Sequence, residues 1–270
     1  MTLRFGQISI GGDDSVGSIA YELGQSPTTQ QNDLTSFEIR KLGVSYPWKY
    51  STFISEDGGL GNEAKNSVGA ACVDSSNGNV YIAFNGSSPC DASSINIAAT
   101  DDVNATYSSR ILGIDQDGSK FLDVAIRFPN IQNPAYTKKM ILVYGLDVNE
   151  STKDIYVCGV YRYLDSSSAN PTADYSRGFV AKIDRFGITR WLEISNKQDV
   201  SSGYWPMSFT SIKYYPNASY LYCLGTQRDP TNTSLTTLYL YVVNESDGQI
   251  PKSYRITGSG TTGPIVGNQI

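Results

Sequence analysis

Short apolar runs separated by turn residues recur along the chain, and they predict β-strands. In the clearest stretch, 139–196, apolar runs at 140–146, 155–161, 178–183 and 189–194 alternate with segments rich in Asp, Asn, Gly and Ser. β-branched and aromatic runs bounded by such residues are typical of antiparallel strands joined by turns. This stretch therefore predicts a four-stranded antiparallel meander.

A tyrosine near the start of the second predicted strand repeats along the chain. In the clearest stretch it is Tyr156, and Tyr21, Tyr81 and Tyr222 begin related phrases elsewhere. Internal repetition of this kind indicates a repeat architecture. With the tyrosine as landmark, the chain divides into four units and a tail: 3–55, 67–128, 139–195, 208–257 and 258–270.

Four-stranded antiparallel units repeated along a chain are typical of β-propeller blades. We therefore expect an all-β protein, a single-domain β-propeller of about four blades that either closes or forms an arc of a larger ring. The tail at 258–270 would close the ring or begin another blade. Tandem β-sandwiches would also give short strands at regular spacing. The repeated tyrosine phrase favours the propeller.

Two phrases and one tryptophan in these units resemble the secreted SBBP-type β-propeller repeat. Residues 179–184 read Phe-Val-Ala-Lys-Ile-Asp, residues 78–81 read Gly-Asn-Val-Tyr, and Trp191 follows the first of these phrases. Blades of that family carry similar phrases on their second and third strands and a later Trp. The resemblance is clearest over 139–195, and it implies a secreted protein with packed blades. Such phrases describe blade packing, so they carry no functional residues across.

Composition and charge narrow the classes of partner. The chain has 270 residues, 40% of them hydrophobic, which is enough to bury one or two cores. Its net charge is −5 and it has no cluster of Lys and Arg, so we expect no nucleic-acid or anionic-membrane partner. It contains neither an apolar signal segment at its start nor a run long enough to span a membrane. If the chain is secreted, its numbering starts after a removed signal or inside a larger protein.

The absence of histidine excludes several mechanisms. Ser-His-Asp and Cys-His catalysis and His-bearing zinc sites all need an imidazole. Carboxylate pairs remain at Asp13-Asp14, Asp101-Asp102 and Asp115/Asp117, where a calcium site or a glycosidase pair is one interpretation. Turn capping by Asp is the favoured one. We expect no enzyme activity, no cofactor and no metal.

Six Asn-x-Ser/Thr sequons suggest an extracellular glycoprotein. All six fall in predicted turns or loops, where a bulky glycan would be solvated. We therefore expect N-linked glycans at Asn85, Asn104, Asn149, Asn217, Asn232 and Asn244.

Cysteines and tryptophans give further candidate sites. Cys72 and Cys90 are placed for a local disulfide, whereas Cys158 and Cys223 are expected as buried thiols because packed sheets lie farther apart than a disulfide reaches. Trp48 and Trp191 are expected to pack between blades. Tyr204 and Trp205 lie between units and could stack on a sugar.

Two functions follow as expectations. The first is a non-enzymatic extracellular glycoprotein whose propeller is structural or adhesive, as in a surface appendage, matrix or filament. Its partners would be other proteins, including copies of itself. The alternative is a glycan-binding or glycan-cleaving propeller that acts through its long second-to-third strand loops. That site would use Asp101, Asp102 and Asp174 as carboxylates, with Tyr204 and Trp205 as stacking residues.

Overall fold

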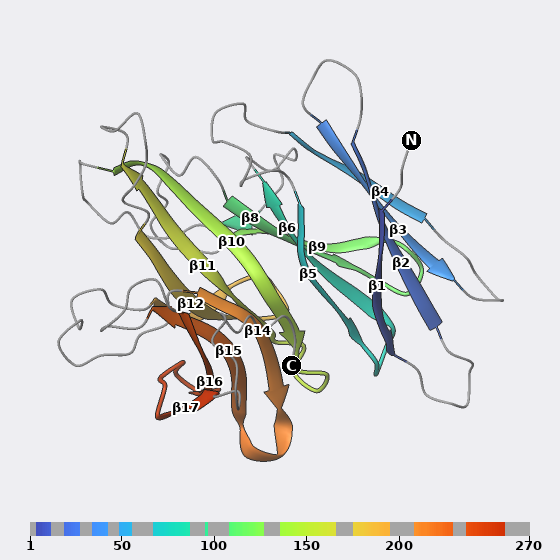
Figure 1. Ribbon diagram of the computed structural model, residues 1–270. Helices are drawn as coiled ribbons and strands as arrows, with labels where there is room; N and C mark the ends of the chain where they lie inside the picture. The colour runs from blue at the N-terminus through green and yellow to red at the C-terminus, as the bar shows by residue number, and fades with distance from the viewer. Residues whose placement is uncertain are drawn as a thin grey trace. The chain divides into compact units, whose positions relative to one another are not determined.

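The computed structural model describes eleven stretches of the chain, and nearly all of their residues are in β-strands (Figure 1). No α-helix occurs in these stretches, and none of their elements is a helix able to span a membrane. The described stretches are 4–11, 19–27, 34–42, 49–55, 67–86, 95–96, 108–126, 136–165, 175–194, 208–228 and 236–256.

Four sheets follow one another along the chain. Three have four antiparallel strands in sequence order, and one has β5, β6, β8 and β9 with the short β7 added in parallel beside β9. The first sheet contains β1 (Arg4–Gly11), β2 (Ile19–Pro27), β3 (Leu34–Leu42) and β4 (Lys49–Ser55). The second contains β5 (Ser67–Asp74), β6 (Asn79–Gly86), β7 (Ile95–Asn96), β8 (Ser108–Ile114) and β9 (Lys120–Ile126).

The third and fourth sheets are built in the same way. The third contains β10 (Tyr136–Val148), β11 (Ile155–Asp165), β12 (Tyr175–Ile183) and β13 (Thr189–Ile194). The fourth contains β14 (Ser208–Tyr215), β15 (Tyr220–Arg228), β16 (Thr236–Asn244) and β17 (Lys252–Ile256), with the 3-10 turn η2 (Pro216–Ala218) between β14 and β15. The described part of the protein is therefore all-β, with three sheets of four antiparallel strands and one sheet that adds a short parallel strand to such a set. This confirms the predicted fold class of repeated four-stranded antiparallel units.

The chain forms two compact units, Met1–Asn130 and Ile131–Ile270. In the first, β6, β8 and β9 supply a core of fully buried aliphatic and aromatic side chains. Beside this core, Arg110 donates to both carboxylate oxygens of the buried Asp123, and Lys120 Nζ also lies 2.7 Å from Asp123 Oδ2. A bidentate pair satisfies both charged groups, which a buried ion pair requires.

In the second unit, the sheet β10–β13 packs against the sheet β14–β17. Alternation along each strand places every second side chain in the core between them. The third sheet contributes Tyr156, Cys158 and Val180, and the fourth contributes six further buried side chains. Cys158 and Cys223 are fully buried free thiols, as predicted, and burial raises the pKa of each.

A glycine allows β10 and β14 to approach each other closely. Gly145 lies opposite Cys158 at a register shift in β10. A Cβ atom built on Gly145 would lie 2.7 Å from Cys158 Sγ and 2.9 Å from the backbone nitrogen of Ile212 in β14. The missing side chain therefore sets the spacing between β10 and β14.

We predict that Gly145→Ala destabilises the second unit by about 1–3 kcal/mol, because the added methyl group must displace the β14 backbone. Urea denaturation of the variant and the parent protein measures this loss. Lys252→Ala, a change at an exposed position of β17, is the control and should alter the free energy of unfolding by less than about 0.5 kcal/mol. Equal stability of parent and Gly145→Ala would contradict the close approach.

Candidate functional site

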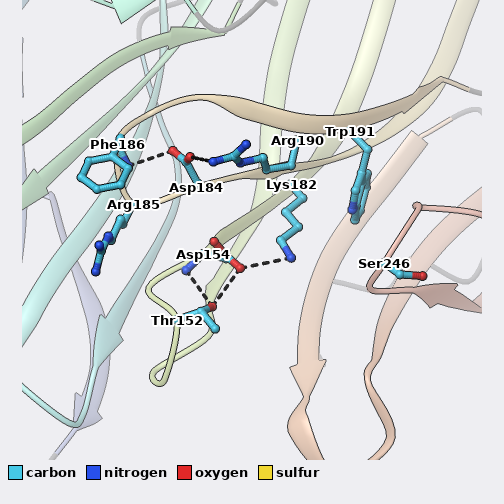
Figure 2. Close-up of a pocket in the computed structure, with 9 residues that line it drawn as sticks. All are labelled: Thr152, Asp154, Lys182, Asp184, Arg185, Phe186, Arg190, Trp191 and Ser246. Carbon is cyan, nitrogen blue, oxygen red and sulfur yellow. Dashed lines mark hydrogen bonds and ion pairs between the residues drawn. The ribbon is translucent and has the colours of Figure 1, made fainter.

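A shallow hollow lies where three turns of the second unit meet: residues 149–154 between β10 and β11, 184–188 between β12 and β13, and 244–249 between β16 and β17. We call it the turn hollow, and its volume is about 360 Å³. Figure 2 shows that its lining is mostly charged or aromatic. The lining residues are Thr152, Asp154, Lys182, Asp184, Arg185, Phe186, Arg190, Trp191 and Ser246.

Asp184 builds one wall of the turn hollow by capping its own turn. Its Oδ1 atom accepts hydrogen bonds from the backbone N–H groups of Phe186 and Ile188, both at 2.9 Å. Gly187 completes the turn at a φ of 86°, a left-handed conformation that glycine adopts without strain. The tight turn leaves the side chains of Arg185 and Phe186 at the rim, with the guanidinium 4.6 Å from the centre of the ring.

Asp184 is held as a carboxylate. Burial alone would raise its pKa, but the hydrogen bonds from Ile188 and Phe186 and the nearby Arg190 outweigh burial and lower it. Arg190 Nη2 lies 2.6 Å from Asp184 Oδ2. An ionised carboxylate with these partners is a poor proton donor, so it is unsuited to general-acid chemistry.

A row of four side chains crosses the third sheet beside the turn hollow. Asp147, Tyr156, Lys182 and Trp191 pair directly across β10, β11, β12 and β13, so they share the face that packs on the fourth sheet. Tyr156 stacks on Tyr214 of β14, with ring centroids 5.1 Å apart.

Asp147, at one end of this row, contacts the first strand of the fourth sheet. Its carboxylate accepts hydrogen bonds from the backbone N–H of Tyr214 at 2.7 Å and from Lys213 Nζ at 3.0 Å. β14 is an edge strand of its sheet, so some of its backbone donors need partners from outside the sheet. The buried Asp147 supplies such a partner.

Glu245, in the turn between β16 and β17, joins the rest of the row to the fourth sheet. Its carboxylate accepts hydrogen bonds from Tyr156 Oη at 2.8 Å and from Lys182 Nζ, and its backbone carbonyl accepts one from Trp191 Nε1 at 2.9 Å. Lys182 Nζ also lies 3.1 Å from Asp154 Oδ2. We call this set of contacts the Glu245 clamp.

The Glu245 clamp raises the pKa values of Lys182 and Tyr156. Burial alone would lower the pKa of Lys182, but the hydrogen bonds to Glu245 and Asp154 outweigh burial and raise it. Burial and the bond to Glu245 raise the pKa of Tyr156. Both groups therefore keep their protons at neutral pH, and the arrangement suits a contact between sheets better than proton transfer.

Two interpretations of turn and strand residues are confirmed. Trp191 packs between the two sheets and donates its indole hydrogen bond across the interface, as predicted for blade packing. Asp115 caps its turn, because its Oδ1 atom accepts hydrogen bonds from the backbone N–H groups of Asp117 and Ser119 at 3.0 and 2.8 Å.

No group of three or more metal-ligating side chains occurs within the described stretches.

The four sequons in the described stretches differ in environment. Asn217 is exposed in η2, and Asn244 is half-buried at the end of β16. Asn149 lies in a turn as predicted, but it is buried and its Oδ1 atom accepts hydrogen bonds from the backbone N–H groups of Ser151 and Thr152. It is therefore not open to solvent, contrary to the expectation for all six sequons.

The predicted position of Asn85 is wrong. It lies within β6, not in a loop, with 3% of its surface exposed, and its Oδ1 atom accepts a hydrogen bond from Ser109 Oγ at 2.7 Å. Strand β6 continues to Gly86 because its residues from Val80 to Gly86 all pair with β8. The sequence pattern alone placed the strand end one residue before Asn85.

Several candidates fall outside the described stretches, and their roles stay predictions. Cys72 is buried in β5, but its proposed partner Cys90 is among those outside. The others are Asp13, Asp14, Trp48, Asp101, Asp102, Asn104, Asp174, Tyr204, Trp205 and Asn232.

Sequence reasoning missed the Glu245 clamp. One signal for it was present: Lys182 interrupts the apolar run at 178–183, and a charge in such a run needs a partner when it is buried. The partner Glu245 lies in an ordinary polar turn, which offers no comparable signal.

Comparison with known proteins gives no family. No family model matches the chain, and no curated protein matches it. Among solved structures, the chain is similar to one titled "Hadza microbial sialidase Hz136", with 11% identity and a TM-score of 0.32. The match covers 94% of this chain and 58% of that one. A likeness at this level carries no argument about activity.

We predict that Lys182→Met destabilises the second unit by about 1–3 kcal/mol, because Glu245 and Asp154 lose their shared cation while partly buried. Urea denaturation measures the change. Lys213→Met is the matched control: Lys213 is exposed, and Asp147 keeps the backbone N–H of Tyr214, so its cost should stay below about 1 kcal/mol. Equal costs for the two variants would contradict the clamp.

We predict that Asp184→Asn costs about 1 kcal/mol at pH 7 and less at acid pH. The pKa of Asp184 is lower in the folded protein, so its stabilisation is complete above the unfolded value of about 3.9 and is lost as the pH falls through the folded value. Urea denaturation between neutral and acid pH tests this. Arg190→Gln, which removes the exposed partner, should cost less than Asp184→Asn. A difference between parent and Asp184→Asn that grows on acidification would oppose this assignment.

Proposed function

We propose that this chain is a non-enzymatic, structural or adhesive β-propeller module of an extracellular glycoprotein, such as a subunit of a surface appendage, matrix or filament. One observation carries the proposal. The carboxylates lining the turn hollow are paired with cations and serve the turn or the contact between sheets. These carboxylates therefore stabilise a turn and the contact between the two sheets.

The sequons support the extracellular part of the proposal. Asn217 is exposed on a short turn, where an attached glycan would extend into solvent. Asn85 is the opposite case, because the folded protein buries it against Ser109. A glycoprotein of this fold would carry glycans on its turns and keep its strand faces for contacts between blades.

The experiment is intact-mass spectrometry of the native protein before and after glycan removal, with thiol alkylation after unfolding. We expect a mass well above 29.4 kDa that falls on deglycosylation. Cys158 and Cys223 should be alkylated, whereas Cys72 and Cys90 should be protected until reduction if they are bridged. An unmodified mass with four alkylated cysteines would overturn the extracellular assignment.

Two variants sharpen this measurement. Asn217→Gln should remove the mass of one glycan, because the side chain is exposed. Asn85→Gln should leave the glycan mass unchanged, because the amide is buried in the folded protein. The reverse result would show that the exposure of the folded chain does not govern its modification.

A further inference from the structure

Two turns of the protein share one backbone conformation. In both, an Asp backbone N–H donates to the carbonyl of the residue four positions later at 2.9 Å, and the Asp side chain caps the turn. Gly118 and Gly187 occupy the same left-handed position, at φ of 88° and 86°. The β8–β9 turn and the β12–β13 turn are therefore equivalent structures with different sequences.

The side chains at the two tips differ in character. The β8–β9 turn carries Gln116, Asp117 and Ser119, which are polar and exposed. At the equivalent positions the β12–β13 turn carries Arg185, Phe186 and Ile188, and Phe186 and Ile188 are 58% and 52% exposed. Because polar residues build the same turn, the exposed apolar pair is not needed to fold it. Exposed apolar groups beside an Arg are typical of the centre of a protein interface.

The β12–β13 tip is basic as well as apolar. Arg185 stacks on Phe186, and no ion pair joins it to a carboxylate of the described stretches. Arg190, at the base of the same turn, is 56% exposed beside its partner Asp184. A fitting partner would present a carboxylate next to an apolar side chain.

The chain itself offers such a surface at the β8–β9 turn. Asp117 is exposed at the tip, and Phe121, four residues later, is 43% exposed while one edge of its ring packs on Tyr81. The two turns therefore complement each other in charge, and each adds an aromatic ring.

We propose that a second copy of this chain docks its β8–β9 turn onto the β12–β13 turn, with Asp117 paired to Arg185 and Phe121 packed against Phe186 and Ile188. This inference rests on the proposed structural role and names the surface through which copies would assemble. The contact joins two different surfaces that every copy carries. A reciprocal pairing around a two-fold axis gives a closed dimer, whereas a head-to-tail pairing gives, on repetition, a ring or an open filament.

A charge exchange tests the proposal by sedimentation velocity over a range of protein concentrations. Wild-type protein should self-associate. Arg185→Asp and Asp117→Arg should each raise the dissociation constant about tenfold or more, because each places like charges in the contact. An equimolar mixture of the two variants should recover association, because every contact between unlike copies again joins opposite charges.

The exchange is designed to leave the fold intact. The equivalent position of Asp117 holds Phe186 and that of Arg185 holds Gln116, so neither turn depends on these side chains. Circular dichroism should therefore match the parent protein. Association that is unchanged in both variants, or a mixture that stays monomeric, would overturn this contact and leave the structural role standing. Wild-type protein that stays monomeric would overturn both the contact and self-assembly, whereas the glycoprotein assignment would still depend on the mass measurement.

Discussion

The two sheets of the second unit are held in register by the carboxylate of Glu245. Apolar packing brings the sheets together, but it is not directional, so it does not by itself fix how one sheet is placed along the other. The hydrogen bonds from Tyr156 and Lys182 to Glu245, and from Trp191 to its carbonyl, supply that direction. The turn hollow exists because this clamp sets three turns around it.

Polar contacts and apolar packing are also separated within the third sheet. The row of Asp147, Tyr156, Lys182 and Trp191 makes polar contacts near the turns. In the neighbouring row, Gly145, Cys158 and Val180 are small and apolar, and the row ends at Glu193 in β13. A close-packed interior and a hydrogen-bonded rim are typical of well-specified interfaces. The contact between the third and fourth sheets therefore resembles a protein–protein interface, although both sheets belong to one chain.

Local sequence patterns predicted the features that depend on neighbours in the chain. The strand at 189–194 and the Asp-capped turn before it follow from alternation and turn chemistry. Features that depend on distant partners were not predictable. Asn85 is buried because β8 pairs beyond the apolar run, and β7 joins β9 in parallel from inside a polar loop. The Glu245 clamp needs the placement of one sheet on another, which no local pattern encodes.

The reactivity of two buried thiols reports how often the two sheets of the second unit separate. Cys158 and Cys223 lie in the same core between the sheets and are fully covered. A reagent that attacks thiolates can reach them only when the sheets separate, and burial keeps both thiols protonated until then. Their rate of reaction in the native protein would therefore report how often the third and fourth sheets separate, without an engineered cysteine.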